Sequence, residues 1–268
     1  MIRTTSVQPV AEPIALNEAK LHLRVDSTAD DETITALIRA ARQWCEAYEG
    51  QSYMMREVKV YLDDLQSVCL TVFPLISVSS VQYVDTAGDT QTLSSSVYTV
   101  DTDSIPGRLY LAYNQSWPTT RDIPKAATIT LRCGYATTFT AATNDTLTLG
   151  NGYFSNGDSV RVCVSTEDAA ALPAPLAINT DYYVGDVSGV TCNLYTDSAL
   201  TSGVDITDTG TGTFYIGFSG RGLVPDRVIH SMKLLLGHLY EHREENSEIA
   251  LNRMPFGVKN LLLERVWI

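Results

Sequence analysis

Two stretches near the start of the chain repeat their hydrophobic residues at the three- and four-residue spacing of a helix. Residues 13–25, PIALNEAKLHLRV, begin with a proline and carry one mostly apolar stripe. Residues 29–50, ADDETITALIRAARQWCEAYEG, begin with acidic residues, which the helix dipole favours, and end with glycine, a common helix stop. The spacing predicts two helices, and the second has an apolar face made of Ile34, Leu37, Ile38, Ala41, Trp44, Cys45 and Tyr48.

The hydrophobic period then changes to two, which is typical of half-buried strands. Residues 55–65, MREVKVYLDDL, alternate apolar and charged positions, and residues 67–85 continue in the same way with a break at Pro74. Residues 87–91, AGDTQ, indicate a turn, and residues 95–113 and 125–135 predict further strands.

Residues 137–218 have a different composition, rich in Thr, Asn, Asp and Gly. Five strand-like runs, among them DSVRVCVS and DYYVGDVS, alternate with turns. This stretch holds nine acidic residues and one basic residue, Arg161, so it carries −8 of the chain's net charge of −12. We therefore expect a compact all-β domain inserted into another fold. The predicted division is 1–136, the N-terminal part of a core, then 137–218, the insert, and 219–268, the C-terminal helices and tail.

The helical period returns in residues 224–246, VPDRVIHSMKLLLGHLYEHREEN, and residues 255–268 add a short helix and an apolar tail. The apolar faces of helices 30–49 and 225–245 are each too wide to remain exposed, so we expect them to pack together. The predicted fold class is α+β, with a helical core built from both ends of the chain, a β-rich middle and an inserted all-β domain. The apolar face of the later helix comprises Val228, Met232, Leu235, Leu236 and Leu239.

Composition excludes several classes of function. An acidic chain with a pI of about 4.7 is poorly suited to sequence-specific DNA binding, which needs cationic contacts to phosphate. The five cysteines form no C-x-x-C pair, so they are interpreted as reduced, buried thiols. No stretch approaches the ~20 apolar residues that span a bilayer, so we expect no membrane contact.

One short motif raises the possibility of an enzyme. His238, Glu241 and His242 form H-x-x-E-H, the pattern of a zinc peptidase in which both histidines bind the metal. Such a site needs a third ligand from a distant element, and Glu264 is the one weak candidate in the short chain that follows. The histidines also end an apolar helix, where cations suit the dipole. We therefore expect a polar helix end, with no metal, no cofactor and no catalysis.

The two ends of the chain resemble a known family. Residues 13–51 carry L-x-E-A-K-x-H-L-R and a second helix, and residues 224–268 carry P-x-x-V, L-Y-x-x-R-E and P-x-G-V-x-x-L-L. In this order they resemble phage head–tail connector (adaptor) proteins of the gp6-like and phiE125 gp8-like kind. The phrases FSNGDSVRV and NTDYYV in the insert are similar to a small β domain of phage structural proteins.

The resemblance implies a virion structural protein, assembled in the host cytoplasm as a homo-oligomeric ring of about twelve copies below the portal. The ring would extend the channel through which packaged DNA passes, without sequence-specific binding, and would bind tail or neck proteins. The apolar tail suggests portal docking by Val266, Trp267 and Ile268, and the alternative is that Trp267 folds back onto its own subunit. An alternative is a host- or carbohydrate-binding module carried by the insert, where Tyr182 and Tyr183 would point to opposite faces of a strand. We assign the ring contacts to Trp44, Tyr48, Leu235, Leu239 and Arg243.

Overall fold

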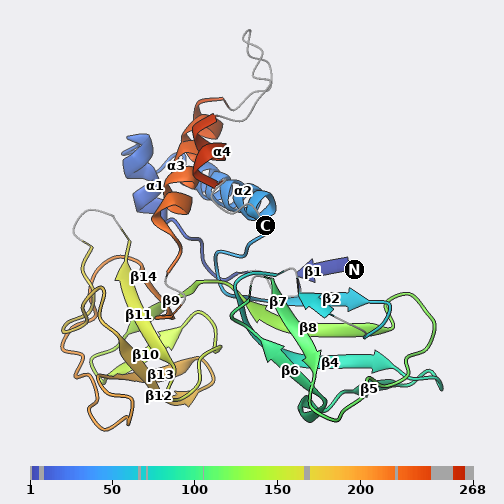
Figure 1. Cartoon of the computed structure of the whole chain (residues 1–268). Coiled ribbons are helices and arrows are strands. Elements are labelled where there is room, and N and C mark those ends of the chain that lie inside the picture. Colours follow the sequence, from blue (N-terminus) through green and yellow to red (C-terminus); the bar gives the residue numbers. More distant parts are fainter. Residues whose placement is uncertain are drawn as a thin grey trace. The chain divides into compact units, whose positions relative to one another are not determined.

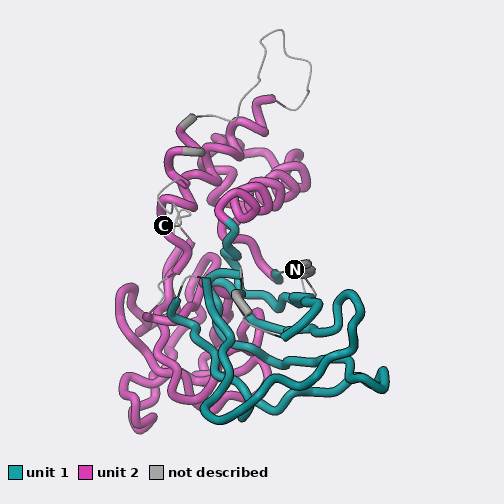
Figure 2. Tube along the Cα trace, turned by 45° about the vertical axis from the view of Figure 1, so that its right-hand side comes forward, with its two compact units in different colours: residues 1–9, 50–134 teal, residues 10–49, 135–268 magenta. Residues whose placement is uncertain are grey.

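The chain folds into two compact units, each built from segments distant in sequence (Figures 1 and 2). The first unit, teal in Figure 2, comprises residues 1–9 and 50–134, and the second, magenta, comprises residues 10–49 and 135–268. The computed structural model describes residues 2–5, 9–65, 68–70, 72–104, 106–165, 170–220, 223–242 and 256–262. This partition differs from the predicted three-part division, because residues 10–49 group with the later part of the chain and not with the β-rich segment that directly follows them.

The two ends of the chain contribute a bundle of four helices to the second unit. Helix α2 runs antiparallel to α3, because Tyr240 near the end of α3 donates a 2.6 Å hydrogen bond to Asp30 at the start of α2. At the opposite ends, Arg227 forms a 2.6 Å ion pair with Glu49. The predicted packing of the two long helices is therefore confirmed. The helices are α1 Leu16–Leu23, α2 Asp31–Glu49, α3 Asp226–Glu241 and α4 Phe256–Leu262.

The apolar faces predicted for these helices form the core of the bundle. Each fully buried aliphatic side chain of this kind contributes about 1.5–3 kcal/mol to folding. Gly50 ends α2 with φ of +69°, a conformation that glycine adopts without steric cost. Pro225 caps the start of α3, where its missing N–H costs nothing. The buried residues include Ile34, Ile38, Ala41 and Cys45 of α2, Val228, Met232, Leu235 and Leu236 of α3, and Val258 and Leu262 of α4.

The first unit is a β structure with two sheets. The larger sheet has the order β1-β2-β8-β4-β5, and the smaller one has the order β3-β7-β6. The alternation predicted for residues 55–65 is confirmed, since Val58 and Val60 of β2 are buried while Glu57 and Lys59 are half-buried. The strands are β1 Ile2–Thr5, β2 Arg56–Leu62, β3 Val68–Leu70, β4 Leu75–Val84, β5 Thr90–Thr92, β6 Tyr98–Asp101, β7 Gly107–Leu111 and β8 Ala127–Cys133.

Two strands of this unit were not predicted. Strand β1 pairs with β2 although about fifty residues separate them, and its side chains carry no periodic pattern long enough to show it. The stretch 87–91 was expected to be a turn, but Thr90 and Gln91 already pair with β4 as part of β5. Beyond β8, Gly134 has φ of +121°, and a Cβ atom there would lie 2.5 Å from the backbone of Met54. Only glycine therefore fits where the chain leaves the first unit.

The remaining strands close into a barrel within the second unit. The order is β10-β13-β12-β11-β14-β9, all pairs are antiparallel, and β9 pairs with β10 to complete the ring. Closure leaves no unpaired strand edge. The sequence did not indicate β9, because ATTFTA is threonine-rich and lacks a clear apolar alternation. The strands are β9 Ala136–Ala141, β10 Thr146–Leu149, β11 Ser159–Val164, β12 Tyr182–Ser188, β13 Thr191–Tyr195 and β14 Phe214–Phe218.

The barrel is joined to the rest of the chain at two neighbouring points. Its first strand begins at Ala136, which pairs directly with Gly217 at the end of its last strand. The chain therefore enters and leaves the barrel side by side, as in a domain inserted between two halves of another fold.

Deleting residues 137–218 and joining the ends through a short Gly/Ser linker should leave the helical bundle folded. The linker need only bridge two neighbouring strand ends, and the bundle has its own buried core. Circular dichroism and urea unfolding would measure whether the helices persist. A remainder that unfolds would show that the barrel belongs to the core of the second unit and that the predicted domain division is wrong.

Candidate functional site

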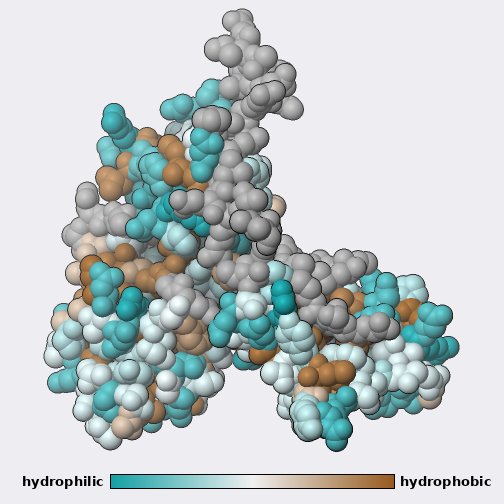
Figure 3. All heavy atoms as spheres, viewed as in Figure 1, coloured by the Kyte–Doolittle hydropathy of each residue, from teal (hydrophilic) through white to brown (hydrophobic). Residues whose placement is uncertain are grey.

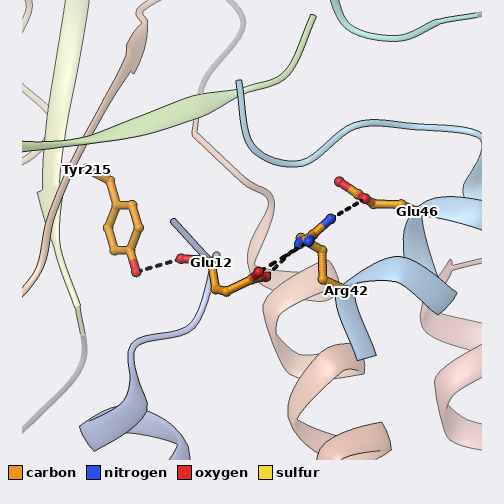
Figure 4. Close-up of polar contacts among 4 residues, drawn as sticks. All are labelled: Glu12, Arg42, Glu46 and Tyr215. Carbon is orange, nitrogen blue, oxygen red and sulfur yellow. Dashed lines mark hydrogen bonds and ion pairs between the residues drawn. The ribbon is translucent and has the colours of Figure 1, made fainter. Parts of the chain in front are cut away.

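The second unit contains a connected set of buried charges that links three of its segments (Figure 4). The guanidinium of Arg42 on α2 is 2% exposed and binds both carboxylate oxygens of Glu12, with N–O distances of 2.5 and 3.2 Å. Its Nη1 atom also donates to Glu46, one turn further along α2, at 2.8 Å. The backbone carbonyl of Glu12 accepts a 3.1 Å hydrogen bond from the hydroxyl of Tyr215 on β14. Glu12 thus connects the helical bundle with the barrel.

The electrostatics of this cluster keep Arg42 charged. Burial lowers the pKa of Arg42, but the hydrogen bonds that Arg42 donates to Glu12 and the negative charges of Glu46 and Glu12 outweigh it and raise the pKa above its usual value. Bidentate arginine–carboxylate pairs are among the strongest polar contacts in proteins, and they fix geometry as well as charge. The cluster therefore acts as a rigid junction inside the unit.

Further ion pairs hold the helices to one another. Lys20 of α1 binds Asp31 at the start of α2 at 2.7 Å, and Lys233 of α3 binds the buried Glu18 of α1 at the same distance. Together with the pair between Arg227 and Glu49, these contacts join α1, α2 and α3. The charged groups inside the bundle are used for contacts between its own elements.

The histidines of the H-x-x-E-H motif lie at the end of α3. Their rings are 4.7 Å apart between centroids, and a ring nitrogen of His242 lies 3.0 Å from the backbone carbonyl oxygen of His238. Over the described ranges, no group of three or more His, Cys, Asp or Glu side chains is placed to hold a metal ion. The geometry is that of a helix end, where the His242 ring lies against the last turn.

Three of the cysteines that the structure describes, Cys45, Cys133 and Cys192, are buried like core residues, and Cys163 is half-buried. Burial, with the charges of Glu49 and Glu46, raises the pKa of Cys45 to about 12, and burial raises that of Cys192 to about 11. A thiol with so high a pKa is a poor nucleophile at neutral pH. No helix in the described part of the chain is both long and apolar enough to cross a membrane.

The structure brings two of the predicted ring contacts together. Trp44 and Tyr48 of α2 stack at 5.2 Å between ring centroids with an interplanar angle of 13°, and Tyr48 is 41% exposed. Leu239 of α3 is half-buried. Leu235 is 1% exposed and packs inside its own bundle, so the monomer leaves it no surface for a neighbouring subunit. Arg243 and the predicted portal-docking residues Val266, Trp267 and Ile268 lie outside the described residues.

The sequence did not indicate a second group of exposed apolar and aromatic side chains, which lies in the first unit. Tyr113 is 99% exposed, and Tyr110 and Leu111 of β7 and Ile123 are also exposed. The alternation of apolar and polar residues along a strand does not by itself show which apolar side chains face the core and which face solvent.

In the barrel, Tyr182 is buried and Tyr183 is half-buried, which confirms their predicted placement on opposite faces of a strand.

The fold and this site define a structural scaffold of a particular class: a helical bundle assembled from both ends of a chain that carries two β modules. The paired buried charges hold that scaffold together.

The comparisons with known proteins agree with this class. Residues 13–105 match the family described as phage gp6-like head–tail connector protein, a range that runs from α1 into the loop after β6. The resemblance to this family is therefore confirmed over that range, and residues 224–268, on which it also rested, lie outside the match. No protein of curated function matches the chain.

Solved structures extend the likeness to the whole fold. A chain in the neck of an empty gene transfer agent (GTA) particle, computed with C6 symmetry, is 14% identical with a TM-score of 0.54, over 98% of this chain and 94% of that one. A chain from the native particle's neck, computed with C12 symmetry, is 13% identical with a TM-score of 0.52, over 98% and 93%. A chain of the native GTA virion is 15% identical with a TM-score of 0.51, over 98% and 93%. The likeness to these structures confirms the α+β fold. Neither the family match nor the similar structures support the alternative of a host- or carbohydrate-binding module.

Proposed function

We propose that the protein is a head–tail connector, or adaptor, of a phage-like particle: a virion structural protein without catalytic activity or cofactor. The observation that carries the proposal is the match of residues 13–105 to the connector family. The likeness to neck chains over nearly the full length, both β modules included, supports the same role. The protein would be assembled in the host cytoplasm and would reside between the head and the tail of the virion.

The proposed assembly is a homo-oligomeric ring of twelve copies below the portal. Neck structures of similar fold computed with C6 and C12 symmetry support a ring whose copy number is a multiple of six. The neighbours in such a ring meet head to tail, so each copy presents two different surfaces. We assign one of them to the bundle, with the half-buried Trp44 and the exposed Tyr48 near the end of α2 and the half-buried Leu239 near the opposite end of the bundle. Arg243 remains a further proposed contact.

Replacing Tyr48 with alanine should weaken ring assembly while leaving the subunit folded. Interface tyrosines of this kind contribute about 2 kcal/mol or more, which corresponds to a loss of roughly thirtyfold in association. Mass photometry over a concentration series would measure the shift. The matched control is Tyr113→Ala, which removes a 99% exposed tyrosine from the other unit. Equal assembly of the Tyr48 variant and the native chain would exclude the stack from the ring interface.

The proposed ring surrounds DNA without holding it tightly. The insert carries a net charge of −8, and like charges on neighbouring copies repel one another unless they lie at the outer rim, where solvent screens them. The wall of the channel would then carry mixed charge and make few counterion-releasing contacts to phosphate. In a gel-shift titration the free protein should bind linear DNA weakly, with little dependence on salt. Tight binding that falls steeply as salt rises would contradict this arrangement.

The proposed partners are the portal protein above the ring and tail or neck proteins below it. Docking on the portal is assigned to Val266, Trp267 and Ile268, because three large apolar residues in sequence suit an anchor in a neighbour's groove. The exposed Tyr110 of β7 and Tyr113, in the first unit, are further side chains that a protein partner could contact.

A further inference from the structure

The chain passes between its two units at three points, where teal and magenta meet in Figure 2. Relative motion of two units is the default expectation when they are joined by short connections, and three connections restrict that motion more than one does. The backbone on either side of each crossing therefore decides which motion remains. The crossings are the peptide bonds Pro9–Val10, Glu49–Gly50 and Gly134–Tyr135.

On the side of the first unit, two of the crossings are held by the same short segment. The backbone N–H of Ser52 donates a 2.7 Å hydrogen bond to the carbonyl oxygen of Phe73. The backbone N–H of Gly134 donates a 3.0 Å hydrogen bond to the carbonyl oxygen of Pro74. Because Phe73 and Pro74 are adjacent in sequence, the chain leaves the first unit at Gly50 and at Gly134 in neighbouring positions.

On the side of the second unit, the same two crossings are fixed within two residues. Glu49, directly before Gly50, forms a 2.6 Å ion pair with Arg227 of α3, and its side chain is 3% exposed. Ala136, the second residue after the other crossing, pairs with Gly217 at the end of β14. One of these anchors belongs to the helical bundle and the other to the barrel.

The third crossing leads into the junction that joins the bundle to the barrel. Glu12, the third residue of the second unit in sequence, binds Arg42 of α2 through its carboxylate and accepts a hydrogen bond from Tyr215 of β14 through its carbonyl (Figure 4). A buried bidentate pair of this kind fixes geometry. The bundle and the barrel are therefore held as one body at the point where the chain enters the second unit.

A glycine lies between the fixed ends at each of the two neighbouring crossings. Gly50 has φ of +69°, and no atom lies within 4 Å of the position that a Cβ would occupy. Gly134 has φ of +121°, and since its N–H is held by Pro74, backbone rotation is left to the bond on its carbonyl side. Glycine tolerates a wide range of backbone angles, and hinges concentrate their rotation in a few such residues. Two neighbouring hinge residues allow rotation about the line that joins them and oppose other motions.

The barrel surface offers little resistance to such a rotation. Its lower part in Figure 3 is mainly white and teal, the colours of residues with intermediate or hydrophilic character. The hydrophobic effect scales with the apolar area removed from water, so covering or uncovering this part of the surface changes the free energy little.

We propose that Gly50 and Gly134 form a hinge on which the second unit, bundle and barrel together, rotates as one body relative to the first. The crossing at Pro9–Val10 limits the range of the rotation. In the free subunit several angles are populated, and contacts that a neighbouring copy makes to both units select one of them. This selection rests on the proposed ring, whereas the hinge does not.

Distances between spin labels test the hinge in the dilute, free subunit. The labels are introduced as unnatural amino acids at the exposed positions Gln82 of β4, Ala40 of α2 and Thr148 of β10, so the native cysteines remain. The pairs 82–40 and 82–148 join the two units, and the pair 40–148 lies within the second unit. Double electron–electron resonance should give distributions at least about twice as wide for the two joining pairs as for the internal pair. In the assembled ring the joining pairs should narrow.

A substitution at the hinge gives a second, independent measurement. Gly50→Val places a β-branched residue where φ is +69°, a conformation that valine avoids, so it should shift or narrow the distances of both joining pairs while the internal pair keeps its distance. The matched control is Gly189→Val in the turn between β12 and β13. Gly189 has φ of +62° and equally open space around it, but it lies far in sequence from every crossing, so its replacement should leave all three distances unchanged.

Three results would overturn the proposal. Joining pairs no wider than the internal pair would show that the two units are fixed to one another. An internal pair as wide as the joining pairs would show that the bundle and the barrel do not move as one body. Equal effects of Gly50→Val and Gly189→Val on the joining pairs would remove Gly50 from the hinge. All three are measured on the free subunit, so failure here is distinct from failure of the connector role.

Discussion

Replacing Arg42 with alanine is expected to lower the free energy of unfolding of the helical bundle by about 3–5 kcal/mol. Arg42 is 2% exposed, and its guanidinium binds Glu12 and Glu46. Without this cation both carboxylates lose its charge and its hydrogen bonds, and removing one partner of a buried ion pair commonly costs more than the pair itself contributes. A loss of this size lowers the melting temperature by roughly 6–20 °C in a protein of about this length.

Urea unfolding followed by far-ultraviolet circular dichroism measures the effect, because that signal reports the helices. Arg39→Ala is the matched control, since Arg39 is exposed on the same helix and its removal should change stability by no more than about 0.5 kcal/mol. Arg42→Lys should fall between the two, because lysine keeps the charge but cannot bind a carboxylate with two parallel hydrogen bonds. Equal effects of the Arg39 and Arg42 variants would contradict the role of this cluster as the junction of the unit.

Removing residues 264–268 is expected to abolish attachment to portal-bearing heads while the subunit remains folded. The segment contains Trp267 between Val266 and Ile268. A tryptophan at the centre of an interface commonly contributes about 2 kcal/mol or more to the binding free energy, and removing its apolar neighbours as well lowers the affinity further. Since ~1.4 kcal/mol corresponds to tenfold in affinity, losing the three together should move binding beyond detection at micromolar concentrations.

Co-sedimentation of purified subunits with heads measures attachment, and circular dichroism of the same sample verifies the fold. A full-length chain in which serine replaces Val266, Trp267 and Ile268 separates the loss of apolar anchors from the loss of length, and it should behave like the truncated chain. Unchanged attachment of either variant would exclude docking by this segment. An unfolded variant would instead assign the segment to the core of its own subunit.

Hydrophobic period predicted most of the secondary structure but not the way that the chain divides. The spacing of Ile34, Ile38 and Ala41 on α2, and of Val228 and Met232 on α3, was sufficient to predict two amphipathic helices that pack together. Strands with regular alternation, such as β2 and β11, were predicted for the same reason. Strand β1 forms by pairing with β2, and β9 by pairing with β14. A local sequence pattern does not show pairing partners that are distant in sequence.

The sequence predicted less of the candidate site than of the secondary structure. Glu12 lies outside any helix and thirty residues before Arg42, so neither helical spacing nor a motif indicates their contact. Leu235 and Tyr48 both lie on apolar helix faces, yet one is buried and the other is exposed, because burial depends on which part of each face the neighbouring helices cover.

Electron microscopy of the purified protein mixed with portal-bearing heads tests the connector role most directly. The expected result is a closed ring of twelve copies on the axis of the portal, with an open channel at its centre and the barrels at its rim. Density should follow the helical bundles around the ring, with α2 facing the neighbouring copy. Heads that remain undecorated at saturating protein, or subunits bound singly away from the portal axis, would contradict it.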